Sequence, residues 1–523
     1  MSTIIFTRVE FNYTSPYSEI FSDLSLILDS TWRSGLVGRN GRGKTTFLKL
    51  LDGELEPVSG EITNTLSTRY FPGDVPAKGQ STLVVIRNLI APYDLWESEM
   101  ARLLELSDPD SLEAYSQLQS QYQDARGYKI NGLIEREIQK MGLSREVLDR
   151  PFEVLSLGQQ TQIQIVSLFL GQPTFALIDE PTNHLDIECR KALGDYLSQQ
   201  HGFLLVSHDR ALLNACTDHI ISINRSDVRV NQGNWSTWRD EMEKELLSEA
   251  RSRSQIESEV KQLQRTAQQR RQGADQKESE KYGNSHADTG FIGHKAAKQM
   301  KRAMNAERRV ERQLEGKQAL LKNQEKERDL IVTTQAKKGK TMLTVNNLTI
   351  DIADNRIVTN LSFNIAAGER VALVGPNGCG KSSVLDAIVG KIGFDGTVSF
   401  RGRHFSRSWQ QPLWSSGSLR EHLKHSALNE TRFRQYLGIL DVRGDIFEQP
   451  LESFSQGQLK KVDLTRSLLE PAELLLWDEP MNYLDVDSRE MIEDGIIRGN
   501  PTMLVIEHDE QFIESVATTV INL

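Results

Sequence analysis

Cysteine is scarce in this chain: Cys189, Cys216 and Cys379 are the only three among 523 residues. They are too few and too scattered for a disulfide framework or a cysteine-ligated metal cluster. No stretch approaches 18 consecutive apolar residues, and the first residues place Arg8 and Glu10 inside an apolar pattern, so neither a transmembrane helix nor a signal peptide is expected. These absences exclude a membrane-spanning transporter, a disulfide-stabilised secreted domain and an iron–sulfur ATPase, and the expected location is the cytoplasm.

Positive charge is in deficit overall but is concentrated in one segment. The formal net charge is −10, yet residues 251–340 hold 22 Lys and Arg against 12 Asp and Glu. The rest of the chain therefore carries a net charge of −20. An acidic body with one basic segment indicates a localised surface for a polyanion.

Four short motifs occur twice, in the same order. From the signature serine to the last carboxylate of the acidic strand there are 24 residues in both copies. This agreement predicts two copies of one domain. The first copy has 38 additional residues between its first two motifs, and we expect them at about 92–140 as two polar helices around the turn SDPD. The motif pairs are GRNGRGKTT and GPNGCGKSS, LSLGQ and FSQGQ, ALIDEPTNHLD and LLWDEPMNYLD, and VSHD and IEHD.

The first motif pair fits the P-loop pattern G-x-x-x-x-G-K-[ST]. Its glycines let backbone N–H groups surround phosphates, its lysine reaches the β- and γ-phosphates, and its hydroxyl binds Mg²⁺. Both copies stand between an apolar strand and a helix, which is the context that phosphate binding by a P-loop requires. Thr45 and Ser382 are the predicted Mg²⁺ ligands. The predicted ATP-binding residues are Gly38, Arg39, Asn40, Gly41, Arg42, Gly43, Lys44, Thr45 and Thr46, and Gly375, Pro376, Asn377, Gly378, Cys379, Gly380, Lys381, Ser382 and Ser383.

Two apolar strands end in paired acids, and two others lead to a histidine. We predict that Asp179 and Asp478 reach Mg²⁺ through water. Glu180 and Glu479 are the predicted bases that orient and deprotonate the attacking water. The predicted sensors of the γ-phosphate are His208 and His508.

The strings LSLGQ and FSQGQ place a serine and a glycine at the start of a helix, which suits an anion. With the other motifs, they make the chain resemble a tandem ATP-binding-cassette (ABC) ATPase. The resemblance implies that each ATP lies between the P-loop of one cassette and the signature of the other. It pairs Gly38–Thr46 with Phe454–Gln458, and Gly375–Ser383 with Leu155–Gln159. The signature residues so implied are Ser156, Gly158, Gln159, Ser455, Gly457 and Gln458.

The two copies depart differently from the family pattern. Family members usually stack adenine on an aromatic side chain near the first strand; Tyr13 suits this, whereas the second copy offers Ile352. A glutamine that usually touches Mg²⁺ corresponds to Gln410, whereas the first copy has Gly73. We therefore predict that the two sites hydrolyse ATP at unequal rates.

Residues 238–340 contain few strand signals and have apolar residues at helical spacing. We expect two long antiparallel helices joined by a loop at 282–294, whose tip residues are Tyr282, His286, Phe291, Ile292 and His294. Basic residues neutralise phosphates and aromatic residues stack on bases, so RNA contact is expected here. The predicted fold class is α/β: two ABC-type P-loop domains, 1–237 and 341–523, joined by this helical hairpin.

Two cassettes, a long charged linker and the string GNWSTWRDEMEKE resemble the ABC-F family. The sequence motifs of the second half resemble those of family members that protect ribosomes from lincosamides, streptogramin A and pleuromutilins. The resemblance implies ATP and Mg²⁺ as cofactors and the 70S ribosome as partner, with 23S rRNA and P-site or E-site tRNA contacted by the linker. It implies a monomer with an intramolecular sandwich and no membrane or transporter partner.

Three other functions share some of these motifs. A translation factor without a resistance role is the main alternative. The ATPase subunit of a transporter would not explain the basic hairpin. A chromosome-type ATPase would have its cassette split, whereas each half here has its motifs complete and in order.

Overall fold

The computed structural model spans the whole chain and divides by its contacts into two compact units. One unit comprises Met1–Trp235 and Glu327–Leu523, and the other Ser236–Lys326. The predicted tip at 282–294 lies outside the described residues, as does most of the predicted hairpin. The described residues are 3–14, 17–76, 78–106, 108–170, 174–183, 185–224, 227–245, 247–248, 251, 258, 265, 301, 330–336, 339–352, 355–442 and 445–523.

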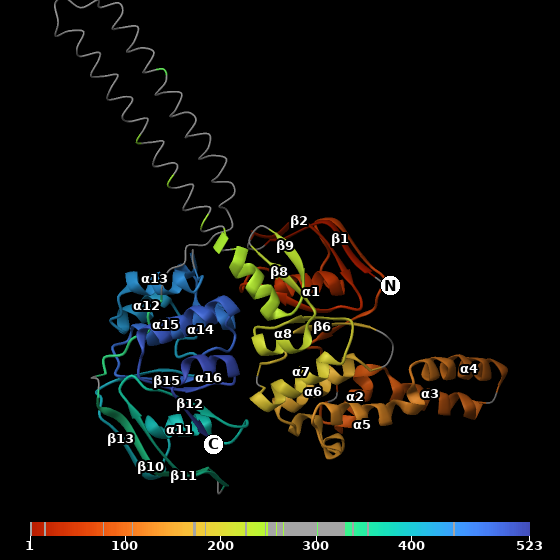
Figure 1. Ribbon diagram of the computed structural model, residues 1–523. Coiled ribbons are helices and arrows are strands. Elements are labelled where there is room, and N and C mark those ends of the chain that lie inside the picture. The colour runs from red at the N-terminus through yellow and green to blue at the C-terminus, as the bar shows by residue number, and fades with distance from the viewer. Residues whose placement is uncertain are drawn as a thin grey trace, which may run out of the picture. The chain divides into compact units, whose positions relative to one another are not determined.

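The first cassette contains two sheets (Figure 1). An antiparallel sheet has the order β2-β1-β4, and a second sheet has the order β5-β6-β7-β3-β8-β9, parallel except for β9. The strands are β1 (Thr3–Thr14), β2 (Tyr17–Asp29), β3 (Arg33–Val37), β4 (Ser59–Asn64), β5 (Thr68–Phe71), β6 (Phe175–Asp179), β7 (Phe203–Val206), β8 (His219–Ile223) and β9 (Val228–Gln232). The helices that pack with them are α1 (Lys44–Asp52), α2 (Thr82–Ile90), α6 (Leu157–Leu168), α7 (Ile187–Ser198) and α8 (Arg210–Cys216).

The second cassette repeats this plan. Its antiparallel sheet has the order β11-β10-β13, and its parallel sheet the order β14-β15-β16-β12-β17. The strands are β10 (Thr341–Ile352), β11 (Asn355–Ala366), β12 (Arg370–Val374), β13 (Asp395–Phe400), β14 (Phe405–Ser408), β15 (Leu474–Asp478), β16 (Met503–Ile506) and β17 (Thr519–Asn522). The helices are α11 (Lys381–Ile388), α12 (Leu419–His425), α13 (Glu430–Ile439), α14 (Gln456–Leu469), α15 (Val486–Gly499) and α16 (Glu510–Val516).

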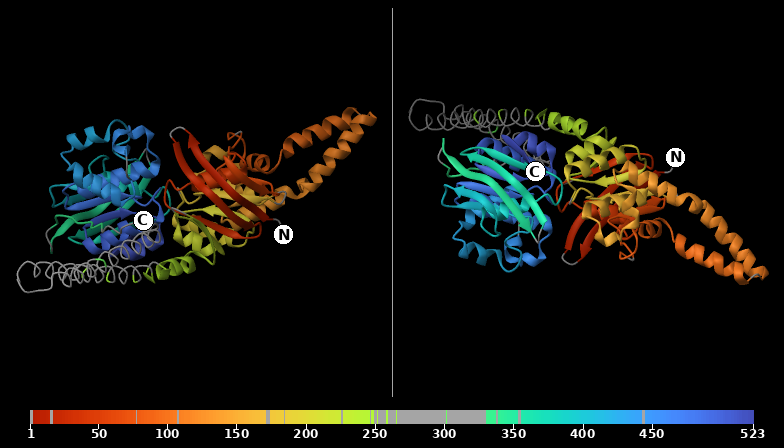
Figure 2. Two further views of the ribbon diagram at one scale, coloured as in Figure 1. Left: turned by 90° about the horizontal axis from the view of Figure 1, so that it is seen from above. Right: turned by 90° about the horizontal axis from the view of Figure 1, so that it is seen from below.

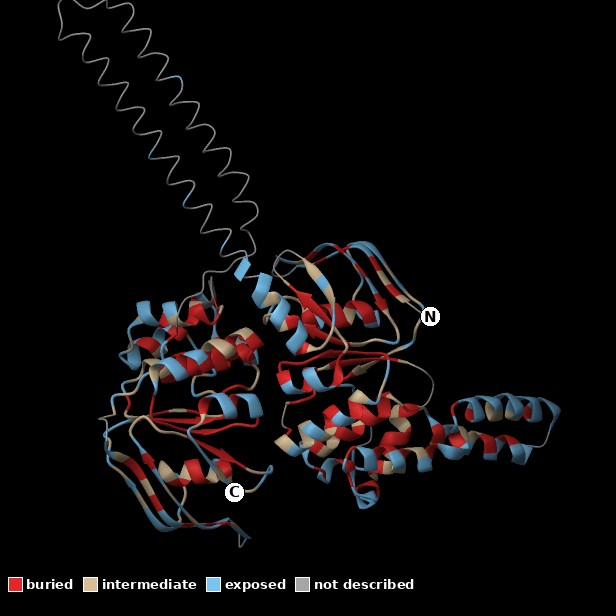
Figure 3. Ribbon diagram, viewed as in Figure 1, coloured by how far each residue is buried: buried red, intermediate tan, exposed pale blue. Residues whose placement is uncertain are grey.

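The central strands β7, β15 and β16 are buried along their whole length, as Figure 3 shows in red. A parallel strand covered on both faces needs apolar residues at every position, which explains the runs FLLV and MLVI. The motif residues follow these runs directly. The sheets thus bring the acids and the histidines to one edge, where the P-loops also lie.

The insertion in the first cassette is helical. It contains α3 (Tyr93–Leu106) and α4 (Pro109–Asp124), which lie side by side in both views of Figure 2, followed by α5 (Ile130–Lys140). Asp108 caps α4 by accepting a hydrogen bond from Ser111 N, as the turn SDPD leads one to expect. Among the described residues, no helix is both long and apolar enough to cross a membrane.

Residues 330–336 pack with the second cassette, whereas the sequence analysis assigns them to the linker at 238–340. Leu330 and Val332 are buried in the core of the second cassette. Val332 N donates to Gly495 O at 3.0 Å, and a Cβ on Gly499 would lie 1.8 Å from Val332 O. Glycine at 495 and 499 thus lets the segment run directly across α15, a packing that sequence periodicity does not reveal.

Candidate ATP-binding sites

Each P-loop connects a buried strand to a helix whose first residue is the motif lysine, Lys44 in α1 and Lys381 in α11. Gly43 adopts φ 94°, and a Cβ there would lie 2.3 Å from Ile20 Cγ2; Gly380 adopts φ 100° and is equally confined by Ile357. Only glycine tolerates this combination. The glycines therefore shape the loop that exposes backbone N–H groups at a helix N-terminus.

The motif lysines fold back onto their own loops. Lys44 Nζ donates to Gly38 O at 2.6 Å, and Lys381 Nζ donates to Gly375 O and Pro376 O, both at 2.8 Å. Burial lowers the pKa of Lys44, and the charges of Glu180, Asp485 and Asp179 oppose that shift. A buried ammonium with only neutral carbonyl and amide oxygens bonded to it suits a phosphate.

Buried polar atoms without partners support the same conclusion. Within the described part of the chain, both ring nitrogens of His508 and Oδ1 of Asp478 are buried and make no hydrogen bond. Such groups are costly to bury unless something binds them. A nucleoside triphosphate would supply a phosphate oxygen as acceptor for His508, and its metal ion would supply a partner for the Asp478 carboxylate.

The two aspartates at the strand ends meet the P-loop hydroxyls. Thr45 Oγ1 donates to Asp179 Oδ2 at 3.0 Å, and the Tyr70 hydroxyl donates to the same oxygen at 3.0 Å. Burial raises the pKa of Asp478 to about 6, and a hydrogen bond from Ser382 opposes this shift. The structure therefore brings together the four residues that the sequence analysis predicts as Mg²⁺ ligands, two in each cassette.

The two glutamates share a strained backbone but differ in their surroundings. Glu180 has φ 48° and Glu479 has φ 47°, in the left-handed region that such residues rarely adopt. Glu479 accepts hydrogen bonds from the amides of Gln410, at 2.7 Å, and Asn482. Glu180 Oε1 is buried without a hydrogen bond. Burial raises the pKa of Glu180 to about 7, and the nearby Lys44 charge opposes that rise.

The strand register explains the difference. Phe71 pairs with Ile178 and Ser408 pairs with Trp477, each partner standing just before the first acid of its strand. Two residues further along lie Gly73 and Gln410. They are therefore equivalent positions, as the sequence alignment of the copies predicts.

Each histidine lies beside the glutamate of its own cassette. His208 Nε2 is 3.4 Å from Glu180 Oε1, and His508 Nε2 is 3.7 Å from Glu479 Oε1. Burial and the Lys44 charge hold the pKa of His208 well below its ordinary value, and burial lowers that of His508 to about 3. Both rings are thus neutral and each can donate one hydrogen bond.

The positions predicted to face adenine are also equivalent in the two cassettes. Ile4 pairs with Asn64 and Leu343 with Phe400, at the same point of β1 and β10, which aligns Tyr13 with Ile352. Both side chains are exposed, and the Tyr13 hydroxyl lies 3.1 Å from Thr46 Oγ1. An aromatic ring therefore stands beside the first P-loop, and an aliphatic side chain occupies the equivalent place in the second cassette.

The signature serines begin helices. Ser156 caps α6 and Ser455 caps α14, each in a reciprocal capping box with the glutamine three residues later. At the first P-loop, a Cβ on Gly457 would lie 3.0 Å from Asn40 Nδ2, and that amide donates to Tyr483 O at 3.0 Å. The second signature therefore adjoins the first P-loop. At the second P-loop, Asn377 N donates to Asp186 Oδ2 at 3.2 Å.

Several contacts escaped the sequence analysis. Tyr70 binds Asp179, and Asn482 binds Glu479. Arg39, inside the P-loop, forms an ion pair of 2.6 Å with Asp487 of the other cassette. Of these contacts, the one between Asn482 and Glu479 had a signal in the sequence, because the asparagine of PMNYLD stands three residues after the glutamate.

The chain matches the sequence family described as ABC transporter at residues 21–183 and 358–482, more than half its length. It is 29% identical to the putative ATP-binding protein YdiF of Bacillus subtilis over 96% of this chain and 77% of that protein. It is 26% identical to ABC transporter F family member 2 of Arabidopsis thaliana over 97% of this chain and 75% of that protein.

A solved structure has the same fold. It is an archaeal ribosome recycling factor in complex with a ribosomal stalk protein, with a TM-score of 0.58 and 18% identity, over 98% of this chain and 87% of that one. The matched family covers both P-loops and both strands that end in paired acids. The chain therefore belongs to the ATP-binding-cassette family, as a tandem ATPase of the ABC-F type.

Proposed function

We propose that this ATPase binds the 70S ribosome while ATP holds its two cassettes together. The observation that carries the proposal is the contact between the first P-loop and the opposite signature, Asn40 beside Gly457. An ATP bound there touches both cassettes, so binding and hydrolysis change how firmly they are joined. A tandem ATPase of this kind binds a large partner in the closed, ATP-bound state and releases it when hydrolysis favours the open state.

In the proposed hydrolysis at the first site, Lys44 and the loop N–H groups bind the β- and γ-phosphates. The Glu180 carboxylate orients a water molecule and accepts its proton as the oxygen attacks the γ-phosphorus, and ADP leaves. Neutral His208 donates a hydrogen bond to the γ-phosphate. Lys381, Glu479 and His508 do the same in the second site, where Gln410 also orients the glutamate.

The donor set suits Mg²⁺. No group of three or more His, Cys, Asp or Glu side chains that could hold a metal ion lies among the described residues. A hydroxyl and a carboxylate, with phosphate oxygens and water, match the preference of Mg²⁺ for few protein ligands. Thr45 and Asp179 would hold it in one site, and Ser382 and Asp478 in the other, where it would neutralise phosphate charge.

The ribosomal target is supported by charge and by similarity. Residues 261–312 hold 13 basic and six acidic residues, in a chain that is otherwise acidic. The archaeal structure of the same fold is named a ribosome recycling factor, and a second, with a TM-score of 0.59 and 18% identity, is described as ribosome-bound. We propose that the linker approaches the peptidyl-transferase region and contacts 23S rRNA and P-site or E-site tRNA.

We further propose that this contact protects ribosomes from lincosamides, streptogramin A and pleuromutilins. The basis is the resemblance of the second-half motifs to resistance members of the family. Expression in a sensitive bacterium should raise the inhibitory concentrations of these drugs. Unchanged inhibitory concentrations, with ribosome binding intact, would favour a translation factor without a resistance role.

The ribosome proposal is tested with the double variant Glu180→Gln, Glu479→Gln. Loss of both bases should abolish turnover and leave ATP binding intact, so the closed state accumulates. Co-sedimentation with 70S particles in ATP should then exceed that of the unaltered protein. A Lys44→Ala, Lys381→Ala variant serves as control, because it should fail to close. Equal, low co-sedimentation of both variants, with ATP binding confirmed for the first, would refute ribosome binding.

A further inference from the structure

The repeat allows the two contacts between cassettes to be compared residue by residue. Asp186 caps α7 and Asp485 caps α15, and four residues later stand Arg190 and Arg489. Each arginine forms an ion pair with an aspartate of its own cassette, the one that caps the helix after the histidine. Arg190 lies 3.2 Å from Asp209, and Arg489 lies 3.1 Å from Asp509. This shared pair fixes the correspondence of the positions around it.

One side of the interface holds a buried ion pair. Arg210, the first residue of α8, is 3% exposed. Its Nη1 donates to Glu493 Oε2 at 3.3 Å, and its Nη2 donates to Glu493 Oε1. Glu490 Oε1 lies 4.0 Å from Arg210 Nη1, and Asp509 Oδ2 lies 3.9 Å from Arg210 Nη2. The guanidinium of the first cassette is thus bound in a fork by a carboxylate of α15 in the second.

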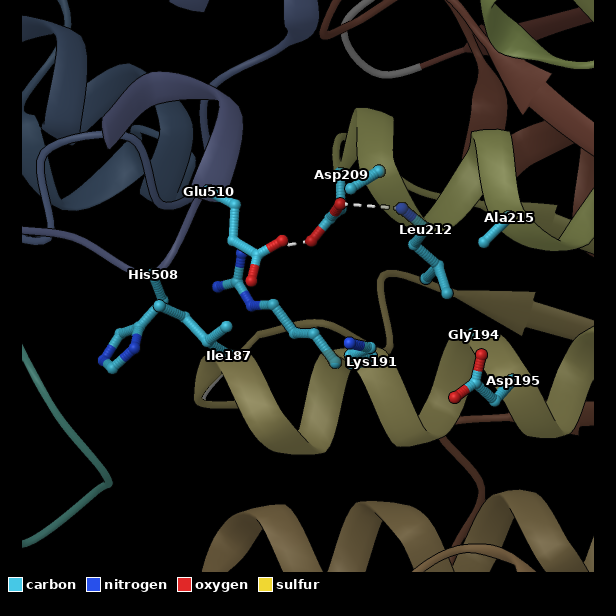
Figure 4. Close-up of a pocket in the computed structure, with 11 residues that line it drawn as sticks. Ile187, Lys191, Gly194, Asp195, Asp209, Leu212, Ala215, His508 and Glu510 are labelled. Atoms are coloured by element: carbon cyan, nitrogen blue, oxygen red, sulfur yellow. Dashed lines mark hydrogen bonds and ion pairs between the residues drawn. The ribbon is translucent and has the colours of Figure 1, made fainter. Parts of the chain in front are cut away.

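The equivalent position on the other side holds no such pair. The residue after Asp509 is Glu510, and the eighth residue after Asp186 is Gly194, where α15 has Glu493. A cavity of about 220 Å³ lies there (Figure 4). Glu510 reaches from the second cassette toward α7, which carries Lys191 and Gly194. Within the described residues, Glu510 and Lys191 have no ion-pair partner, and both are exposed.

The ion pair is connected to the first ATP site through α15. This helix starts at the cap Asp485, eight residues before Glu493 and about 12 Å along the axis. Asp485 is 2% exposed and accepts from Lys461 Nζ, of the signature helix α14, at 2.7 Å. Two residues before Asp485, Tyr483 O accepts from Asn40 of the first P-loop. Anchoring α15 to Arg210 therefore fixes both the signature helix and the loop that faces the first P-loop.

We propose that Arg210 and Glu493 are positioning residues for ATP hydrolysis at the first site. Their ion pair holds the second signature and its following loop against the first P-loop. The second site lacks this anchor, because Gly194 and Glu510 replace the two charged partners. The asymmetry is independent of Gly73 and Ile352, which act within single cassettes.

The test isolates the first site with Glu479→Gln and then adds Arg210→Glu. The kcat should fall by about tenfold or more, because a buried charge pair is broken, whereas ATP binding by the first P-loop should change little. The conservative variant Arg210→Lys keeps the positive charge beside Glu493 and should retain most of the kcat. Glu510→Gln is the matched control at the equivalent position, and it should leave kcat unchanged.

The outcomes are distinct. An unchanged kcat in a folded Arg210→Glu variant overturns the proposal, and so does an equal loss of kcat in Arg210→Lys. If Arg210→Glu does not fold, Glu493→Gln removes one charge at constant shape and should lower kcat when it is measured at a temperature at which circular dichroism shows the variant fully folded. A fall in kcat fully explained by a parallel fall in Tm would also overturn it.

Discussion

Replacing Gly73 with glutamine is expected to lower the pKa of Glu180. The substitution places an amide where Gln410 stands in the second cassette, within reach of the glutamate. A hydrogen bond to a carboxylate favours its ionised form. Gly73 has no left-handed φ, and a Cβ there would lie 3.2 Å from Tyr70 O, so the side chain needs only a small local adjustment.

The magnitude follows from the bond that is gained. A hydrogen bond to a charged group contributes roughly 1.5–3 kcal/mol, which corresponds to about one to two pKa units. The pKa of Glu180, raised by burial to about 7, should fall accordingly. A base must be unprotonated, so activity rises as pH rises through its pKa. At pH 6, first-site activity should increase about five- to tenfold.

The assay is kcat/KM for ATP between pH 5.5 and 8.5, because this ratio reports the pKa of the free enzyme. Glu479→Gln in the background restricts turnover to the first site. Gly73→Ala is the control, since it adds a Cβ without an amide and should leave the midpoint near 7. A midpoint shared by Gly73→Gln and Gly73→Ala would refute the reasoning.

Three further results are expected. Single-turnover rates of Glu180→Gln and Glu479→Gln, each leaving one active site, should differ, because the glutamates have different donors; equal rates would contradict this. Lys461→Met should destabilise the second cassette by about 3–5 kcal/mol, because it leaves a buried aspartate without its cation; an unchanged Tm would show that the pair contributes nothing. Replacing Phe291 and Ile292 with alanine should abolish drug protection while ATPase activity and Tm stay unchanged, because the sequence predicts them at the tip of a long hairpin and outside both ATP-binding motifs; a stable variant with full protection would exclude the tip.

The sequence predicted the repeat, the P-loops, the acidic pairs and the histidines, because each depends on a local pattern. A glycine-rich loop between an apolar strand and a helix is encoded within about 20 residues, and so is a buried strand that ends in acids. Even the replacement of glutamine by Gly73 was visible, since the strands on both sides fixed the alignment. The matched family covers the ranges that contain both P-loops and both acidic pairs.

Other features depend on residues that only the tertiary structure brings together. Burial raises the pKa of Glu180, and no residue type in the sequence indicates how deeply a position is buried. Leu330 and Val332 pack on α15 because Gly495 and Gly499 leave space there. Arg210 meets Glu493 across 283 residues of sequence. Either charge alone predicts an exposed side chain, and the ion pair exists because two folded cassettes exclude water from both partners at once.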